Sequence, residues 1–163
     1  MVEKLTHVDE QGAARMVDVG SKPISRRSAI AQAICEMQSA TGAAIRENTL
    51  KKGEVLQVAR IAAINAAKRT DELIPLCHSL PLDSVDTEFS WESDTRLKIL
   101  VTVNTTGKTG VEMEALVAAS IAATTVYDMC KAVDRSMKIS DVLLIKKTGG
   151  IRGDYQRSEK GDE

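Results

Sequence analysis

Two stretches near the middle of the chain alternate apolar and polar positions, which is the pattern of a β-strand with one covered face. A polar segment, residues 92–95, separates them and has the composition of a tight turn. The positions on the covered face are Val85, Thr87, Phe89 and Trp91 in the first stretch and Leu97, Ile99, Val101 and Val103 in the second. The pattern therefore predicts a β-hairpin.

Three other segments place their apolar residues at helical spacing. They are a short segment at 41–48, a longer one at 54–68, and an alanine-rich run from residue 111 to about residue 135 that contains neither Gly nor Pro. Residues 139–147, which precede a Gly-Gly pair, predict a last strand. The alanines in the two longer helices favour close packing against a neighbouring element.

Residues 24–37 fit two patterns. Ile30, Ile34 and Met37 have helical spacing, whereas the alternating positions from Ala29 to Cys35 indicate a strand. If this segment is a strand, the chain predicts an α+β fold of the split βαβ type, with helices packed on one face of an antiparallel sheet. The alternative is a helix-rich fold.

Composition narrows the class of protein. A chain of 163 residues with 43% hydrophobic content predicts a single domain, residues 1–163, with flexible ends at about 1–4 and 158–163. Four aromatic residues and a net charge of −1 disfavour a nucleic-acid-binding protein. No apolar stretch approaches the roughly 18 residues of a membrane span, and the N-terminus lacks a secretion-signal pattern. We therefore expect a cytoplasmic protein that binds neither nucleic acid nor membranes.

Cys77 and His78 lie between two prolines, which predicts a constrained turn near a surface or cleft. They could supply a nucleophile and a base, metal ligands, or polar groups that hold a substrate; the alternative is a buried thiol beside a hydrogen-bonded imidazole. A metal site is disfavoured because no second cluster of Cys or His follows at ligand spacing. With Cys35 and Cys130, the three cysteines are widely spaced, which predicts reduced thiols.

Asp128 and Lys131 share one face of the predicted long helix, where a surface ion pair is the common alternative to a functional pair. Their apolar neighbours predict a covered helix, and a covered lysine has a pKa lowered toward neutrality. Glu112 and Glu114 open the same helix and complement its dipole. Because Glu114 and Asp128 would lie about 21 Å apart along the helix, a shared site would need a second subunit.

Lysines beside glycine-containing turns could line a phosphate pocket, although such lysines are usually solvated and no P-loop or dinucleotide fingerprint is present. They are Lys51, Lys52, Lys108, Lys146 and Lys147.

Several segments, in chain order, together resemble one family. They are Leu5-Thr6-His7, Met16-Val17-Asp18-Val19, Ala66-Ala67-Lys68-Arg69-Thr70, Leu73-Ile74-Pro75-Leu76-Cys77-His78, Thr106 to Leu116, and Tyr127-Asp128-Met129-Cys130-Lys131-Ala132-Val133. The chain resembles the cyclic pyranopterin monophosphate synthases, the molybdenum cofactor biosynthesis proteins C, from Leu5 to about Asp154.

The resemblance implies a ferredoxin-like two-layer sandwich that assembles as a homohexamer of three dimers, with each active site at a dimer interface. It implies a lyase that converts a cyclised dihydroguanosine triphosphate, derived from GTP, to cyclic pyranopterin monophosphate and releases diphosphate. It implies neither a metal nor an organic cofactor as essential.

The resemblance also assigns residues. The catalytic pair is Asp128 and Lys131. The substrate-binding residues are Leu76, Cys77, His78, Glu112, Met113 and Glu114, with Lys52, Lys147 and Arg27 in a phosphate pocket.

This chain departs from the family pattern at two places near those residues. Ser79 stands where proline usually follows the histidine, and Ile151-Arg152 follows the Gly-Gly pair in place of Lys-Ser. One alternative function is therefore a catalytically impaired pterin- or nucleotide-binding protein on the same scaffold. Further alternatives are an enzyme that uses Cys77 as a covalent nucleophile and a purely structural oligomer.

Overall fold

A computed structural model describes residues 11–151 and 153–158, so the expected flexible ends lie outside the described residues apart from Ser158. The elements, in chain order, are β1 (Ser25–Glu36), α1 (Ser39–Arg46), α2 (Val55–Lys68), α3 (Thr70–Leu73), β2 (Ser84–Ser93), β3 (Arg96–Gly107), α4 (Glu112–Cys130), β4 (Lys138–Thr148) and β5 (Tyr155–Gln156). Among them, no helix is long and apolar enough to cross a membrane.

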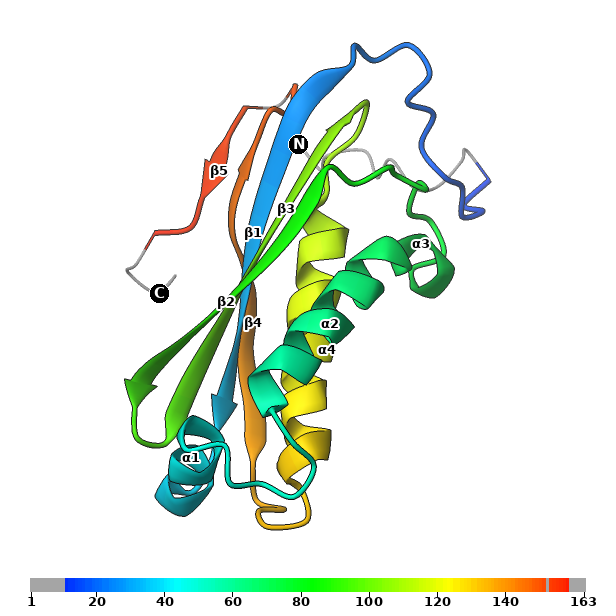
Figure 1. Cartoon of the computed structure of the whole chain (residues 1–163). Coiled ribbons are helices and arrows are strands. Elements are labelled where there is room, and N and C mark those ends of the chain that lie inside the picture. The colour runs from blue at the N-terminus through cyan, green and yellow to red at the C-terminus, as the bar shows by residue number, and fades with distance from the viewer. Residues whose placement is uncertain (1–10, 152, 159–163) are drawn as a thin grey trace.

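The five strands form one antiparallel sheet in the order β2-β3-β1-β4-β5. Helices α2 and α4 lie side by side against one face of this sheet (Figure 1). The α+β two-layer prediction and the predicted hairpin are therefore confirmed. The helix-rich alternative is wrong, because the ambiguous first segment is the central strand β1, paired with β3 along one edge and β4 along the other.

Small side chains fill the space between the two layers. The covered face of β1 carries Ala29, Ala31 and Ala33, all buried, and it packs against α4, which has its own row of buried alanines. Larger buried side chains come from β3, whose covered positions are Leu97, Ile99, Val101 and Val103. Alanine on both helices lets their backbones approach closely, which accounts for the side-by-side packing of α2 and α4.

The long helix ends earlier than its composition predicts. Helix α4 stops at Cys130, and residues 131–137 form a loop that leads into β4. Asp134 in this loop is buried and accepts hydrogen bonds from the Gln38 backbone N–H at 2.8 Å and from the Ser136 hydroxyl at 2.6 Å. These contacts hold the chain away from helical geometry and tie the loop to the start of α1.

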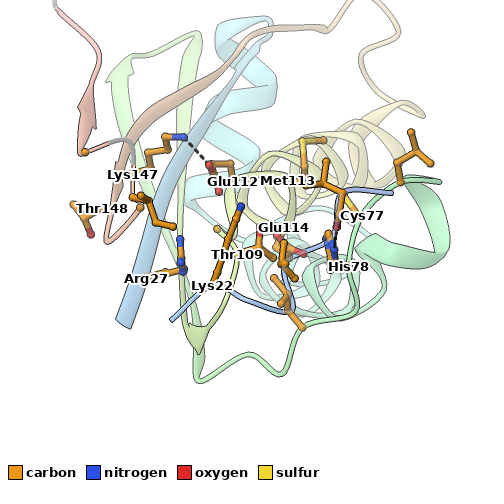
Figure 2. A pocket seen from close by; sticks show the side chains of 18 residues that line it. Lys22, Arg27, Cys77, His78, Thr109, Glu112, Met113, Glu114, Lys147 and Thr148 are labelled. Atoms are coloured by element: carbon orange, nitrogen blue, oxygen red, sulfur yellow. Dashed lines mark hydrogen bonds and ion pairs between the residues drawn. The ribbon is translucent and has the colours of Figure 1, made fainter. Parts of the chain in front are cut away.

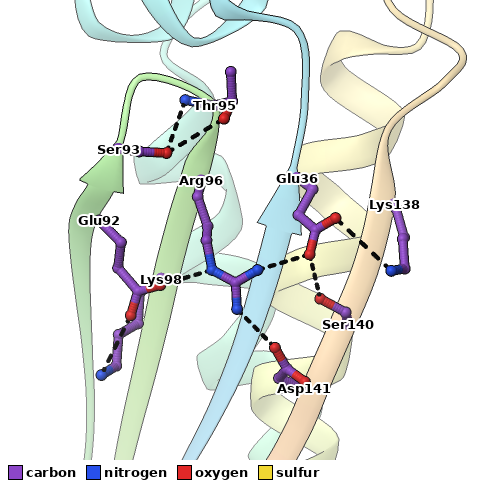
Figure 3. A network of polar contacts seen from close by, with 9 residues as sticks. All are labelled: Glu36, Glu92, Ser93, Thr95, Arg96, Lys98, Lys138, Ser140 and Asp141. Atoms are coloured by element: carbon purple, nitrogen blue, oxygen red, sulfur yellow. Dashed lines mark hydrogen bonds and ion pairs between the residues drawn. The ribbon is translucent and has the colours of Figure 1, made fainter.

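On the sheet face opposite the helices, Arg96 joins three strands (Figure 3). Its guanidinium contacts Glu92 on β2 at 2.8 Å, Glu36 on β1 at 2.7 Å and Asp141 on β4 at 2.7 Å. A planar fork of donors suits several carboxylates at once. This network lies at the end of the sheet where β1 finishes, away from the cavity described next.

Candidate functional site

A cavity of about 670 Å³ opens at the other end of the sheet. It lies between the start of α4, the turn after α3, the end of β4, and the segment that precedes β1 (Figure 2). The predicted site residues that it brings together are Arg27, Leu76, Cys77, His78, Glu112, Met113, Glu114 and Lys147. The volume is typical of a small-molecule site.

Cations line one side of this cavity. Arg27 is buried and donates from Nε to the Gly107 carbonyl and from Nη2 to the Lys108 carbonyl, both at 3.0 Å. Lys147 Nζ lies 2.9 Å from Glu112 Oε1. Lys22 also lines the cavity. It was missed at the sequence level because it belongs to no motif and no regular element.

Glu114 and the thiol of Cys77 line another part of the cavity. Burial raises the pKa of Glu114 to about 7; its backbone hydrogen bond opposes the increase, and the charges of Glu112 and Asp71 add to it. Burial also raises the pKa of Cys77, and the negative charges of Glu114 and Asp71 raise it further. A thiol held protonated is a poor nucleophile, which disfavours the alternative of covalent catalysis by Cys77.

The turn that carries Cys77 and His78 is held by specific hydrogen bonds. The Cys77 backbone N–H donates to the Ile74 carbonyl at 3.1 Å, and His78 Nε2 lies 2.8 Å from the Val17 carbonyl. Since a carbonyl only accepts, His78 donates from Nε2, which leaves Nδ1 of a neutral imidazole as an acceptor.

Ser79 takes part in holding the same turn. Its hydroxyl donates to the Asp71 carboxylate on α3. In place of the rigid ring of a proline, this chain therefore connects the turn to α3 by a side-chain contact. The second departure from the family pattern is Ile151-Arg152. Ile151 lines the cavity, and Arg152 lies outside the described residues.

Asp128 and Lys131 form a second cluster, at the far end of α4. Lys131 Nζ lies 2.7 Å from Asp128 Oδ1, and Lys52 Nζ lies 3.2 Å from Asp128 Oδ2 and 2.8 Å from the Asp128 carbonyl. Hydrogen bonds from Lys131 and then Lys52 lower the pKa of Asp128. Two cations flanking one carboxylate make a cluster with a net positive charge.

The prediction of a covered Lys131 with a lowered pKa is wrong for the single chain. More than half of its side chain is exposed, and the hydrogen bond to Asp128 raises its pKa. The apolar neighbours that suggested coverage, such as Val126 and Cys130, point into the core, whereas Asp128 and Lys131 lie on the opposite side of the chain.

The structure does not bring the two groups of site residues together within one chain. Lys52, Asp128 and Lys131 do not line the cavity, so Lys52 and Lys147 do not share a pocket here. Glu114 and Asp128 belong to one uninterrupted helix, α4, and lie about 21 Å apart along its axis. In the described part of the chain, no three His, Cys, Asp or Glu side chains are grouped so that they could hold a metal ion.

The raised pKa of Glu114 predicts a pH-dependent cost to stability. Because the folded state keeps this proton when the unfolded carboxyl has lost it, stability falls as pH rises from about 4.5 to about 7 and then stays level. We expect the free energy of unfolding of Glu114→Gln to rise by about 3 kcal/mol relative to that of the parent between pH 4.5 and pH 8. Urea unfolding of both proteins at the two pH values measures this gain, and an unchanged difference would contradict it.

Comparison with known proteins gives a consistent result. Residues 16–150 match the model of the MoaC family. The cyclic pyranopterin monophosphate synthase of Brevibacillus brevis is 54% identical over 98% of this chain and 100% of its own length. The synthase of Herpetosiphon aurantiacus is 58% identical over 93% of each chain, and synthase 1 of Mycobacterium tuberculosis is 54% identical over 94% of this chain and 91% of its own. Both clusters of site residues fall inside the matched range.

Proposed function

The chain belongs to the MoaC family, and on this basis we propose that it acts in molybdenum cofactor biosynthesis as a cyclic pyranopterin monophosphate synthase. Its substrate is (8S)-3',8-cyclo-7,8-dihydroguanosine 5'-triphosphate, which it rearranges to cyclic pyranopterin monophosphate with release of diphosphate. This makes the protein a lyase, and the proposal places it in the cytoplasm.

The two-sided charge of the cavity is the observation that carries this proposal. Lys22, Arg27 and Lys147 suit a triphosphate. Glu114, which forms no ion pair with these cations, is an acceptor for the N–H groups of a guanine-derived ring. A substrate that is anionic at one end and rich in donors at the other fits this division. A ligand that is only anionic would leave Glu114 without a role.

A second copy of the chain would complete the site. The midpoint of α4 is Ile121, whose side chain is exposed and which lies midway between Glu114 and Asp128. If two α4 helices met antiparallel at Ile121 across a two-fold axis, Asp128 of the partner subunit would lie beside Glu114. We therefore propose a homodimer as the unit that forms the site, with three dimers making a hexamer of ferredoxin-like subunits.

In such a paired site, the Asp128 cluster would face the substrate ring. Asp128 and Lys131, with Lys52 beside them, would exchange the protons that ring opening and closure require. Closure of the cyclic phosphate needs a sugar hydroxyl oxygen to bond to the α-phosphorus while the bond to the departing diphosphate breaks. The hydroxyl proton goes to the base, and the cations of the cavity stabilise the charge on the leaving group.

Product analysis with matched variants tests the function. We expect the parent protein to release diphosphate and form pterin from the cyclised triphosphate, and Asp128→Asn and Lys131→Ala to lose at least about 100-fold in kcat. Arg96→Lys, on the opposite face of the sheet, is the control that should retain activity. Binding of the triphosphate by the parent protein without diphosphate release would support the impaired binding protein instead.

A further inference from the structure

An acidic side chain occupies the cationic side of the cavity. The Glu112 carboxylate lies 2.9 Å from Lys147 Nζ, and both side chains are more than half covered (Figure 2). Gly110 makes room for this arrangement, because a Cβ at that position would collide with the Glu112 carboxylate. The pair therefore fills a space that the loop before α4 keeps open.

Glu112 is also an acidic residue in the first turn of α4, where the helix dipole favours a negative charge. It is the first residue of α4, whose N-cap residue, Val111, makes no side-chain capping bond. A negative group beside a helix N-terminus and an ammonium has the surroundings that phosphate oxygens prefer in proteins. In this cavity the chain itself supplies that negative group.

We propose that Glu112 acts as an internal stand-in for a phosphate, which holds Lys147 while the site is empty and competes with diphosphate for it. This inference rests on the proposed function for the identity of the anion. Binding of the triphosphate would displace Glu112 from Lys147, and the return of Glu112 would speed the departure of diphosphate. Glu112 is in this view a residue that sets product affinity.

The other cations of the cavity do not share this arrangement. Arg27 already gives two of its donors to backbone carbonyls, and in the described part of the chain Lys22 forms no hydrogen bond or ion pair through its ammonium. A phosphate can therefore contact Lys22 without displacing a protein group. Among these three described cations, Lys147 alone is paired with a carboxylate that must leave when an anion binds, so the competition should be specific to that lysine.

The test is a double-mutant cycle in which calorimetric titration measures the dissociation constant of inorganic diphosphate for the full-length protein. Inorganic triphosphate is the ligand for variants that bind diphosphate too weakly to measure. We expect Glu112→Gln to tighten diphosphate binding about fivefold. In a Lys147→Met background the same substitution should change affinity by less than about twofold, because the competition is gone. In a Lys22→Met background the fivefold gain should remain.

The outcomes separate this inference from simpler effects. Equal tightening in the Lys147→Met and Lys22→Met backgrounds would mean general charge repulsion by Glu112 and would overturn the proposal, as would no tightening in the parent background. Thermal unfolding of each variant checks that the fold is intact. The inhibition constant of diphosphate in turnover should fall by the same factor in Glu112→Gln. If the parent turns over its substrate but Glu112→Gln does not tighten diphosphate binding in this Lys147-dependent way, the stand-in role alone is rejected. If diphosphate binding tightens as expected but the parent shows no turnover, the proposed function is rejected.

Discussion

Replacing Asp134 with alanine should lower the free energy of unfolding by about 3 kcal/mol. The carboxylate is almost fully buried and accepts four hydrogen bonds, from the Gln38 backbone N–H, the Thr41 hydroxyl, and the backbone N–H and hydroxyl of Ser136. Alanine would leave these donors without their shared acceptor, and the Thr41 hydroxyl among them is itself buried. It would also release the start of α1 from the loop after α4. Urea unfolding at pH 7 measures the loss.

The pH dependence of this contribution has a defined sign. Burial alone would raise the pKa of Asp134, but the hydrogen bonds from Gln38, Ser136 and Thr41 together lower it. A lowered folded pKa stabilises the protein above the ordinary pKa of aspartate, about 3.9, and this stability is lost as pH falls through the folded value. The difference between the parent and Asp134→Asn should therefore shrink in acid. A difference that stays constant from pH 7 to pH 3 would show that the charge of Asp134 contributes nothing.

Periodicity predicted most of the fold because most of the elements have one covered face. The hairpin of β2 and β3 and the helices α2 and α4 each have a covered face whose spacing is visible in the sequence. The segment that became β1 was ambiguous for a physical reason. It is the central strand, and small side chains on its covered face together with Ile30 and Ile34 on the other face satisfy both spacings.

The features that could not be predicted depend on contacts between distant segments. Asp134 ends the helical run through its hydrogen bond to Gln38, which is 96 positions away. Strand β5 has two residues and α3 has four, too few to show a period. In the site, the fragments Leu76–His78 and Glu112–Glu114 predicted the cavity through the family resemblance, but Lys22 joins it only through the path of the segment before β1.

Mixing two inactive variants should restore activity if the two clusters act across a subunit interface. Lys131→Ala damages the far cluster of α4, and Lys147→Met damages the cavity. In a mixed dimer, one site combines the intact cavity of the first chain with the intact cluster of the second, and the other site has both defects. Random pairing of equal amounts would make half of the dimers mixed, so we expect about a quarter of parent activity after co-refolding or co-expression.

The control for this experiment combines two variants of the same cluster. In mixed dimers of Lys131→Ala and Asp128→Asn, every site receives one damaged cluster, so no activity should return. If activity returns in the first mixture and not in the second, each site takes its cavity from one chain and its Asp128 cluster from the other. This is the result that we expect, because Glu114 and Asp128 of one chain lie roughly 21 Å apart along α4. No restoration in either mixture, from dimers shown to be mixed, would contradict the shared site and require that one chain bend α4 to bring its own two clusters together.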